Sequence, residues 1–114
     1  MRRLRAAHAA IFLLVIFCAL PAMAAPLCVN GHPAPRPTHL AYGGLAPRVG
    51  YERDHYIPLC LGGADAPANV RYQAYPEAYT KDEEEKRLCE AMCAGRMSLS
   101  AAVAQLKKDW PRGP

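Results

Sequence analysis

The chain has 114 residues, 14 basic and 10 acidic, and a net charge of +4 at neutral pH. This length excludes a multidomain protein, because a typical single domain already needs about 100 residues. Three arginines lie at the very start, so the chain from residue 25 onward carries 11 basic and 10 acidic residues, a net charge of +1. Overall charge therefore says little about nucleic-acid binding, and any such contact must depend on the local placement of basic groups.

Residues 1–24 have the pattern of a secretory signal peptide. A basic start precedes a short apolar run at residues 9–20, and the sequence AMA at residues 22–24 is a small-x-small cleavage site. A transmembrane helix needs about 20 apolar residues, and Pro21 ends the run before that length, although an uncleaved anchor is the alternative. We expect a periplasmic or secreted monomer that has no membrane contact after signal cleavage.

Residues 25–47 should form an irregular N-terminal arm. Five prolines in this stretch remove backbone donors that helices and sheets need. Four cysteines remain after cleavage: Cys28, Cys60, Cys89 and Cys93. In an oxidising compartment they predict two disulfides, which can be paired in three ways. A zinc site made from the same thiols is the alternative, but their spacing is not that of paired CxxC knuckles.

Residues 48–110 are predicted to form one α+β domain. Residues 51–61 favour a strand that ends at the Gly-Gly pair and bends at Pro58, and residues 69–73 favour a second, short strand. Pro76 fits the first turn of a helix over residues 78–94, and Gly95 fits a left-handed stop.

A closing helix is expected from Ser98, a good N-cap, to the residue before Pro111. A two-stranded hairpin is marginal in water, so it must pack on the first helix. Apolar residues at helical spacing predict the buried faces of the two helices: Leu88, Cys89, Met92 and Cys93, then Leu99, Val103, Leu106 and Trp110.

Acidic, amide and imidazole side chains gather in the hairpin and the start of the first helix. Asp54 and His55 are adjacent, Asn69 opens the second strand, and Asp82 and Glu85 share a helical face. This set suits a divalent ion, a general base and a phosphate substrate. Each part alone is ordinary, because an Asp-His pair is commonly a surface hydrogen bond and acidic runs commonly begin helices.

Together these residues resemble the HNH endonuclease family, and specifically its small exported bacterial members. The resemblance rests on DHxIPLxLGG at residues 54–63, the following Asn69, KDxxE at residues 81–85 and the CAG sequence at residues 93–95, and it covers Tyr42 to Trp110. It implies a ββα-metal fold, in which a β-hairpin packed on one helix holds one divalent ion. The closing helix and the N-terminal arm would be additions to this frame.

The resemblance also implies roles for individual residues. Asp54 would be a metal ligand, His55 the general base, and Asn69 the residue that holds the loop and helps to orient His55. The third motif position falls near residues 78–79, where neither residue is a good ligand, so Asp82 is the nearest candidate and Glu85 the alternative. The resulting oxygen-rich site favours Mg²⁺ or Mn²⁺, with Zn²⁺ and Ni²⁺ as alternatives.

Two features of the chain bear on this resemblance. Strict strand alternation would send Asp54 and His55 to opposite faces, so a common site needs a bend or bulge.

Relatives in this family carry Glu where Cys60 stands and His where Cys89 stands, which implies a Cys60–Cys89 disulfide and leaves Cys28 to pair with Cys93. Since Cys89 and Cys93 lie one helical turn apart, they are poorly placed to bond to each other.

The function expected from the resemblance is metal-dependent phosphodiester hydrolysis of nucleic acid, with DNA favoured over RNA. Basic residues beside the motif would contact backbone phosphates: Arg48, Arg53, Arg71 and Lys81. The alternative is a non-catalytic, disulfide-stapled envelope or binding protein that keeps the HNH frame. A toxin restrained by a partner is a third hypothesis that no residue tests.

Overall fold

The computed structural model describes residues 25–112, and the predicted signal peptide lies outside the described residues. This part of the chain is α+β, as the sequence predicts, with two two-stranded antiparallel sheets and two α-helices. In chain order the elements are β1 (Cys28–Val29), β2 (His32–Pro33), β3 (Tyr51–His55), β4 (Val70–Ala74), α1 (Glu77–Cys93) and α2 (Leu99–Asp109). Three short 3-10 turns, η1 (Tyr42–Gly44), η2 (Leu59–Leu61) and η3 (Pro67–Asn69), join them.

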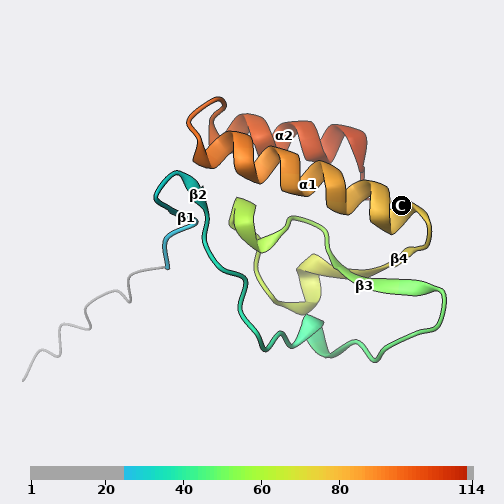
Figure 1. Ribbon diagram of the computed structural model, residues 1–114. Helices are drawn as coiled ribbons and strands as arrows, with labels where there is room; N and C mark the ends of the chain where they lie inside the picture. The colour runs from blue at the N-terminus through green and yellow to red at the C-terminus, as the bar shows by residue number, and fades with distance from the viewer. Residues whose placement is uncertain (1–24, 113–114) are drawn as a thin grey trace, which may run out of the picture.

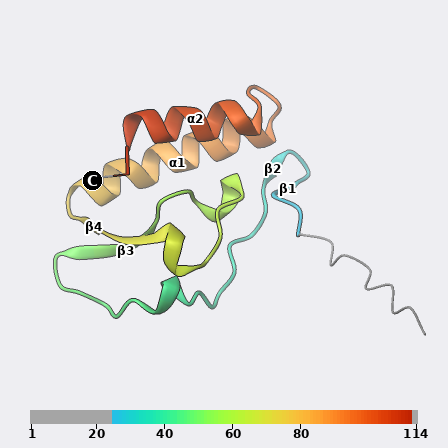
Figure 2. The ribbon, with the colours of Figure 1, turned by 180° about the vertical axis from the view of Figure 1, so that it is seen from behind.

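Helix α1 lies between α2 and the β3–β4 hairpin, so the elements form successive layers (Figures 1 and 2). Contacts of α1 with α2, β3 and β4 agree with this order. On the other side of the hairpin runs the chain that carries η1, and both views show it there. The two faces of the hairpin therefore meet different parts of the protein.

Strand β3 is shorter than the sequence predicts. It pairs with β4 in an unbroken register from Tyr51 opposite Ala74 to His55 opposite Val70. The predicted continuation to residue 61 is wrong, because the chain turns after His55 and Pro58 starts the 3-10 turn η2. Gly63 is required nearby, since a Cβ there would lie 1.8 Å from the carbonyl oxygen of Ile57.

Both helices begin and end close to the predicted residues. Helix α1 ends at Cys93, and Gly95 follows with a φ of 75°, the left-handed conformation expected of a helix stop. Helix α2 begins after Ser98, whose Oγ accepts a hydrogen bond from the backbone N–H of Ala101 at 3.1 Å.

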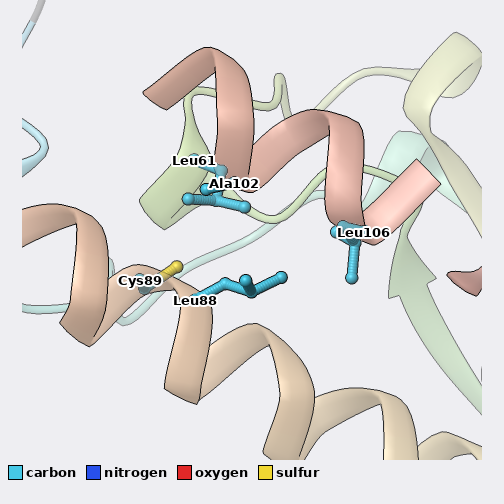
Figure 3. Close-up of a cluster of buried hydrophobic side chains, with 5 residues drawn as sticks. All are labelled: Leu61, Leu88, Cys89, Ala102 and Leu106. Atoms are coloured by element: carbon cyan, nitrogen blue, oxygen red, sulfur yellow. The ribbon is translucent and has the colours of Figure 1, made fainter. Parts of the chain in front are cut away.

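The core lies between α1, α2 and η2 (Figure 3). Leu88, Cys89 and Leu106 are buried as predicted, and Leu61 and Ala102 complete the cluster. The prediction is wrong for Leu99, which is 40% exposed, because α2 turns Ala102 and Leu106, one turn apart, toward α1.

Two disulfides fix the layers to one another, and both have the predicted pairing. Cys60–Cys89 joins η2 to α1 with a Cα–Cα distance of 5.8 Å, and Cys28–Cys93 joins β1 to the end of α1 at 5.5 Å. The arm is mostly irregular, as expected, although β1 and β2 pair briefly. Within residues 25–112, neither helix has the length and apolar character that a membrane span requires.

Candidate functional site

The last two side chains of β3, Asp54 and His55, point to opposite faces of the hairpin. Asp54 contacts Lys81 of α1, whereas His55 contacts Asp65 and stacks on Tyr42 on the other side. The unbroken register with β4 contains no bulge, so the side chains alternate as in an ordinary strand. The bend that a shared Asp54–His55 site requires does not occur within β3.

Three carboxylates from the hairpin and α1 form a cluster on the helix side. One oxygen each of Glu52, Asp54 and Asp82 lies within 4.8 Å of the others. Oxygen ligands of one Mg²⁺ or Mn²⁺ ion, each about 2.0–2.2 Å away, are separated by no more than about 4.5 Å, so this donor set is close to what one such ion needs. Asp54 and Asp82 were expected in the cluster. Glu52 was not, although its position two residues before Asp54 puts it on the same strand face.

The cluster is electrostatically strained. Burial raises the pKa of Glu52 to about 7, and the carboxyl of Asp82 and the charge of Asp54 add to this effect. Burial also raises the pKa of Asp82, and the charge of Asp54 contributes, while the hydrogen bond with Glu52 acts in the opposite direction. Neighbouring carboxylates repel one another, so this cluster gains stability from a proton or a cation.

Lys81 supplies one positive charge to this region. Its side chain is 0% exposed, and its ammonium group donates to Asp54 at 3.1 Å, to the carbonyl oxygen of His55 at 3.0 Å and to Glu85. Buried ammonium groups need such partners, and all three donors are used here. The expectation that Lys81 contacts nucleic-acid phosphates is therefore wrong for this structure.

Glu85 forms an ion pair with Lys81 and is not part of the carboxylate cluster. Burial raises its pKa to about 7, although the ammonium group of Lys81 acts against this. Glu85 is absent from the oxygen set that Glu52, Asp54 and Asp82 form within the described chain. As the alternative metal ligand, Glu85 is less well placed than Asp82.

His55 is held on the opposite face of the hairpin by an acid that the sequence analysis did not single out. Its Nε2 lies 2.8 Å from Asp65 Oδ1, its ring centroid lies 5.2 Å from that of Tyr42, and it is 5% exposed. The hydrogen bond with His55 lowers the pKa of Asp65, and backbone N–H groups of residues 41 and 42 contribute. Asp65 lies in the loop between the strands, where an acid is an ordinary turn residue, so its position gave little signal.

Asn69 ties the loop between β3 and β4. Its amide accepts from the N–H of Ile57 at 2.9 Å and donates to the carbonyl oxygens of Ile57 and Ala64 at 2.8 and 2.9 Å. The loop-holding contact expected of Asn69 is thus present. Its catalytic role stays a prediction.

The remaining predicted basic residues differ in their surroundings. Arg71 lies 3.5 Å from Asp54 and is part of the helix-side network. Arg53 points to the other face, with its guanidinium 4.5 Å from the ring centroid of Tyr42. Arg48 stacks on Tyr51 at 4.2 Å.

Comparison with known proteins gives no match: no family model, curated sequence or solved structure is similar enough to assign the chain to a family.

Proposed function

We propose that this protein is a metal-dependent phosphodiesterase of the HNH type that acts on nucleic acid. The observation that supports the proposal most strongly is the carboxylate cluster of Glu52, Asp54 and Asp82, in which oxygens from hairpin and helix lie within 4.8 Å of one another. Three carboxylates are hard ligands, and they suit Mg²⁺ or Mn²⁺ better than Zn²⁺ or Ni²⁺. A bound divalent ion would supply Lewis acidity toward a phosphate oxygen and stabilise the leaving oxygen.

In this proposal His55 is the proton acceptor, and Asp65 is the residue that positions it. The bond from Nε2 to Asp65 fixes the ring orientation and leaves Nδ1 as the nitrogen that can take a proton. The ring is 5% exposed and stacks on Tyr42, on the hairpin face opposite the carboxylate cluster, so the proposal requires a rearrangement at the end of β3 that brings the imidazole and the cluster to the same phosphate. Asn69 holds the loop that carries Asp65 and so keeps this acid in place.

A nicking assay on supercoiled plasmid tests the proposal, with Mg²⁺, Mn²⁺, Ni²⁺ or Zn²⁺ added one at a time. General-base catalysis contributes about 10²–10⁴-fold, so His55→Ala should slow nicking by about 100-fold or more. His32→Ala, which removes an exposed imidazole from β2, is the matched control and should keep wild-type activity. Equal nicking by wild type and His55→Ala would identify a contaminating nuclease.

Metal binding is measured separately by isothermal titration of Mn²⁺. Glu52→Gln and Asp82→Asn should each weaken binding, because each removes one anionic ligand from the cluster. Glu90→Gln changes the same charge at an exposed position of α1 and should bind as wild type does. Unchanged Mn²⁺ binding in Glu52→Gln would remove this cluster from the proposal.

A second candidate is a non-catalytic, disulfide-stapled envelope or binding protein. The contacts of Lys81 favour it, because its amino group already lies 2.9 Å from Asp54, the expected metal ligand. The burial of His55 favours it as well. The absence of nicking with all four metals would support this candidate against the nuclease.

A further inference from the structure

Two adjoining hollows lie beside β3, away from the buried part of the carboxylate cluster. The first, of about 690 Å³, is lined by Arg36, Tyr42, Arg53 and the arm between them, and the second, of about 420 Å³, by Arg48, Glu52 and Tyr75 among others. Both hollows include Tyr42 and Arg53, so they adjoin, and we call them together the β3-edge groove. Strand β3 pairs along its length with β4, and its first residue, Tyr51, also forms an isolated bridge with Arg48.

Three arginines line this groove, and aromatic rings hold them in place. Arg53 lies 4.5 Å from the ring centroid of Tyr42, and Arg36 donates to the hydroxyl of the same tyrosine at 3.0 Å. Arg48 lies 4.2 Å from the centroid of Tyr51. For Arg48 and Arg53 the ring positions the guanidinium plane without using its hydrogen-bond donors, whereas Arg36 spends one donor on the Tyr42 hydroxyl, and all three groups keep donors for an oxyanion.

These arginines form no salt bridge in the described part of the chain, although the charge of Arg36 acts to lower the pKa of both Glu52 and Asp82. Within residues 25–112, the salt bridges of arginine are Arg71 with Asp54 and Arg87 with Glu84, and none involves Arg36, Arg48 or Arg53. Arg53 spends one donor on the carbonyl oxygen of Leu45 at 3.2 Å. Most N–H donors of the three guanidinium groups are therefore available to a ligand that carries several successive negative charges.

Exposed aromatic rings adjoin the same groove. Tyr75 lines it and is 40% exposed, and it packs on Tyr79, which is 63% exposed, with a centroid distance of 4.8 Å. Unstacked bases bind such rings, whereas the bases of a duplex are stacked on each other and present only their edges. Phosphate-binding arginines beside exposed tyrosines therefore favour a single strand.

We infer that the β3-edge groove binds single-stranded nucleic acid, with backbone phosphates on Arg36, Arg53 and Arg48 and a base on the Tyr75–Tyr79 pair. This inference rests on the proposed function, because Glu52 lines the groove and a strand bound there reaches the carboxylate cluster. It also gives the N-terminal arm a role in substrate binding, since Arg36 belongs to the arm.

Binding of a fluorescein-labelled oligothymidylate, followed by anisotropy in EDTA, tests the inference without hydrolysis. The oxidised wild-type protein is compared with Arg36→Ala and Arg48→Ala, whose side chains are exposed, and with Arg96→Ala, an exposed arginine at the end of α1, as the control of equal charge change. Each groove variant should bind about 3- to 10-fold more weakly than the wild type. The slope of log K against log salt should become less steep by about 0.7, which is the value of one phosphate contact on a single strand. Tyr79→Ala should weaken binding without changing this slope.

Three results would overturn the inference: wild-type affinity in both groove variants, the same loss in Arg96→Ala, or equal binding of a duplex of the same length. Thermal denaturation of each variant verifies that it is folded, and Arg36→Lys, which keeps the charge but not the planar fork, should bind with intermediate affinity. Failure of the proposed function would look different, since the oligonucleotide would bind normally in EDTA and stay uncleaved with every metal. If the groove variants bound the oligonucleotide normally and cleaved it with metal, the inference about the groove would be overturned and the proposed nuclease function would remain.

Discussion

The ammonium nitrogen of Lys81 lies 2.9 Å from a carboxylate oxygen of Asp54, and no part of the Lys81 residue is exposed. This pair joins the end of β3 to the first half of α1, where the resemblance to HNH nucleases implies a metal ion between the two elements. The lysine and a divalent ion therefore compete for the same carboxylate. Under the proposed function, metal binding at Asp54 depends on how firmly Lys81 holds this carboxylate.

Replacement of Lys81 by methionine should be strongly destabilising. It removes the cation, leaves Glu85 without its partner and leaves Asp54 with only the longer contact to Arg71 at 3.5 Å, and breaking a buried pair in this way typically costs about 3–5 kcal/mol. Urea denaturation measures this loss, and Lys86→Met, at an exposed position of α1, is the control that should change stability by less than about 0.5 kcal/mol. Equal stability of the two variants would mean that the Lys81–Asp54 pair is not important for the fold.

A divalent ion should restore part of the stability that Lys81→Met loses. Mg²⁺ or Mn²⁺ in millimolar excess can replace the missing charge between Asp54 and its neighbours, and any ligand of the folded state raises its stability by mass action. The increase should be larger in Lys81→Met than in wild type, because Lys81 no longer competes. The same increase in both proteins would show that the ion binds away from Asp54.

Stability without metal should fall as pH rises from about 4.5 to 7. The folded protein raises the pKa of Glu52 from 4.5 to about 7, so in this window the folded state binds more protons than the unfolded state. The protonated cluster is stable at low pH, and its repulsion is complete above the folded pKa. Glu52→Gln should reduce this slope and be more stable than wild type at pH 8, as measured by urea denaturation at pH 5 and pH 8.

The control for this pH dependence is Glu83→Gln, which changes an exposed carboxyl of α1. It should show the wild-type slope, because its side chain is exposed and is not one of the three carboxylates of the cluster. A wild-type slope in Glu52→Gln would assign the pH dependence to other acids, of which Glu85 is the first to test because burial also raises its pKa.

The elements that local chemistry determines were predictable from the sequence. Gly95 and Ser98 mark the end of α1 and the start of α2, and both do so through the backbone conformation or side-chain bond that these residue types favour. The disulfide pairing was also predicted, from the two positions at which cysteine replaces the residues expected from the resemblance. Asn69 was predicted to hold the loop and does so.

The parts that depend on tertiary packing were less predictable. Lys81 lies on the same helical stripe as Ala78 and Leu88, both buried, yet lysine was assigned to the surface because its charge is usually solvated. Its burial is favourable because Glu85 of the same helix and Asp54 of β3 accept from its ammonium group, and Asp54 belongs to another part of the sequence. Similarly, the contact of Asp65 with His55 depends on the path of the loop.

Substitutions of Asn69 distinguish the hydrogen bond that its side chain accepts from the two that it donates. Asn69→Asp keeps an oxygen for the N–H of Ile57 but loses the donors to the carbonyl oxygens of Ile57 and Ala64, so it should cost about 2–3 kcal/mol, and Asn69→Ala should cost at least as much. Gln73→Ala on β4 is the control, because that amide makes one exposed bond, with Glu77. If Asn69→Ala and Gln73→Ala had equal stability, the loop would not depend on this side chain.

Removal of the two disulfides should have different effects on stability and on oligonucleotide binding. By chain-entropy arguments, bonds that close 29 and 65 residues each contribute about 4 kcal/mol, so the loops alone predict similar losses. Cys89 is 1% exposed in the core, whereas Cys28 and Cys93 are only partly buried, so Cys60→Ala/Cys89→Ala also leaves a cavity and should be the less stable double variant in urea denaturation. Cys28→Ala/Cys93→Ala should instead release the arm that carries Arg36 and weaken oligonucleotide binding while the core stays folded. The reverse order of stability would indicate that the arm, and not the core beneath η2, contributes most to the folded state.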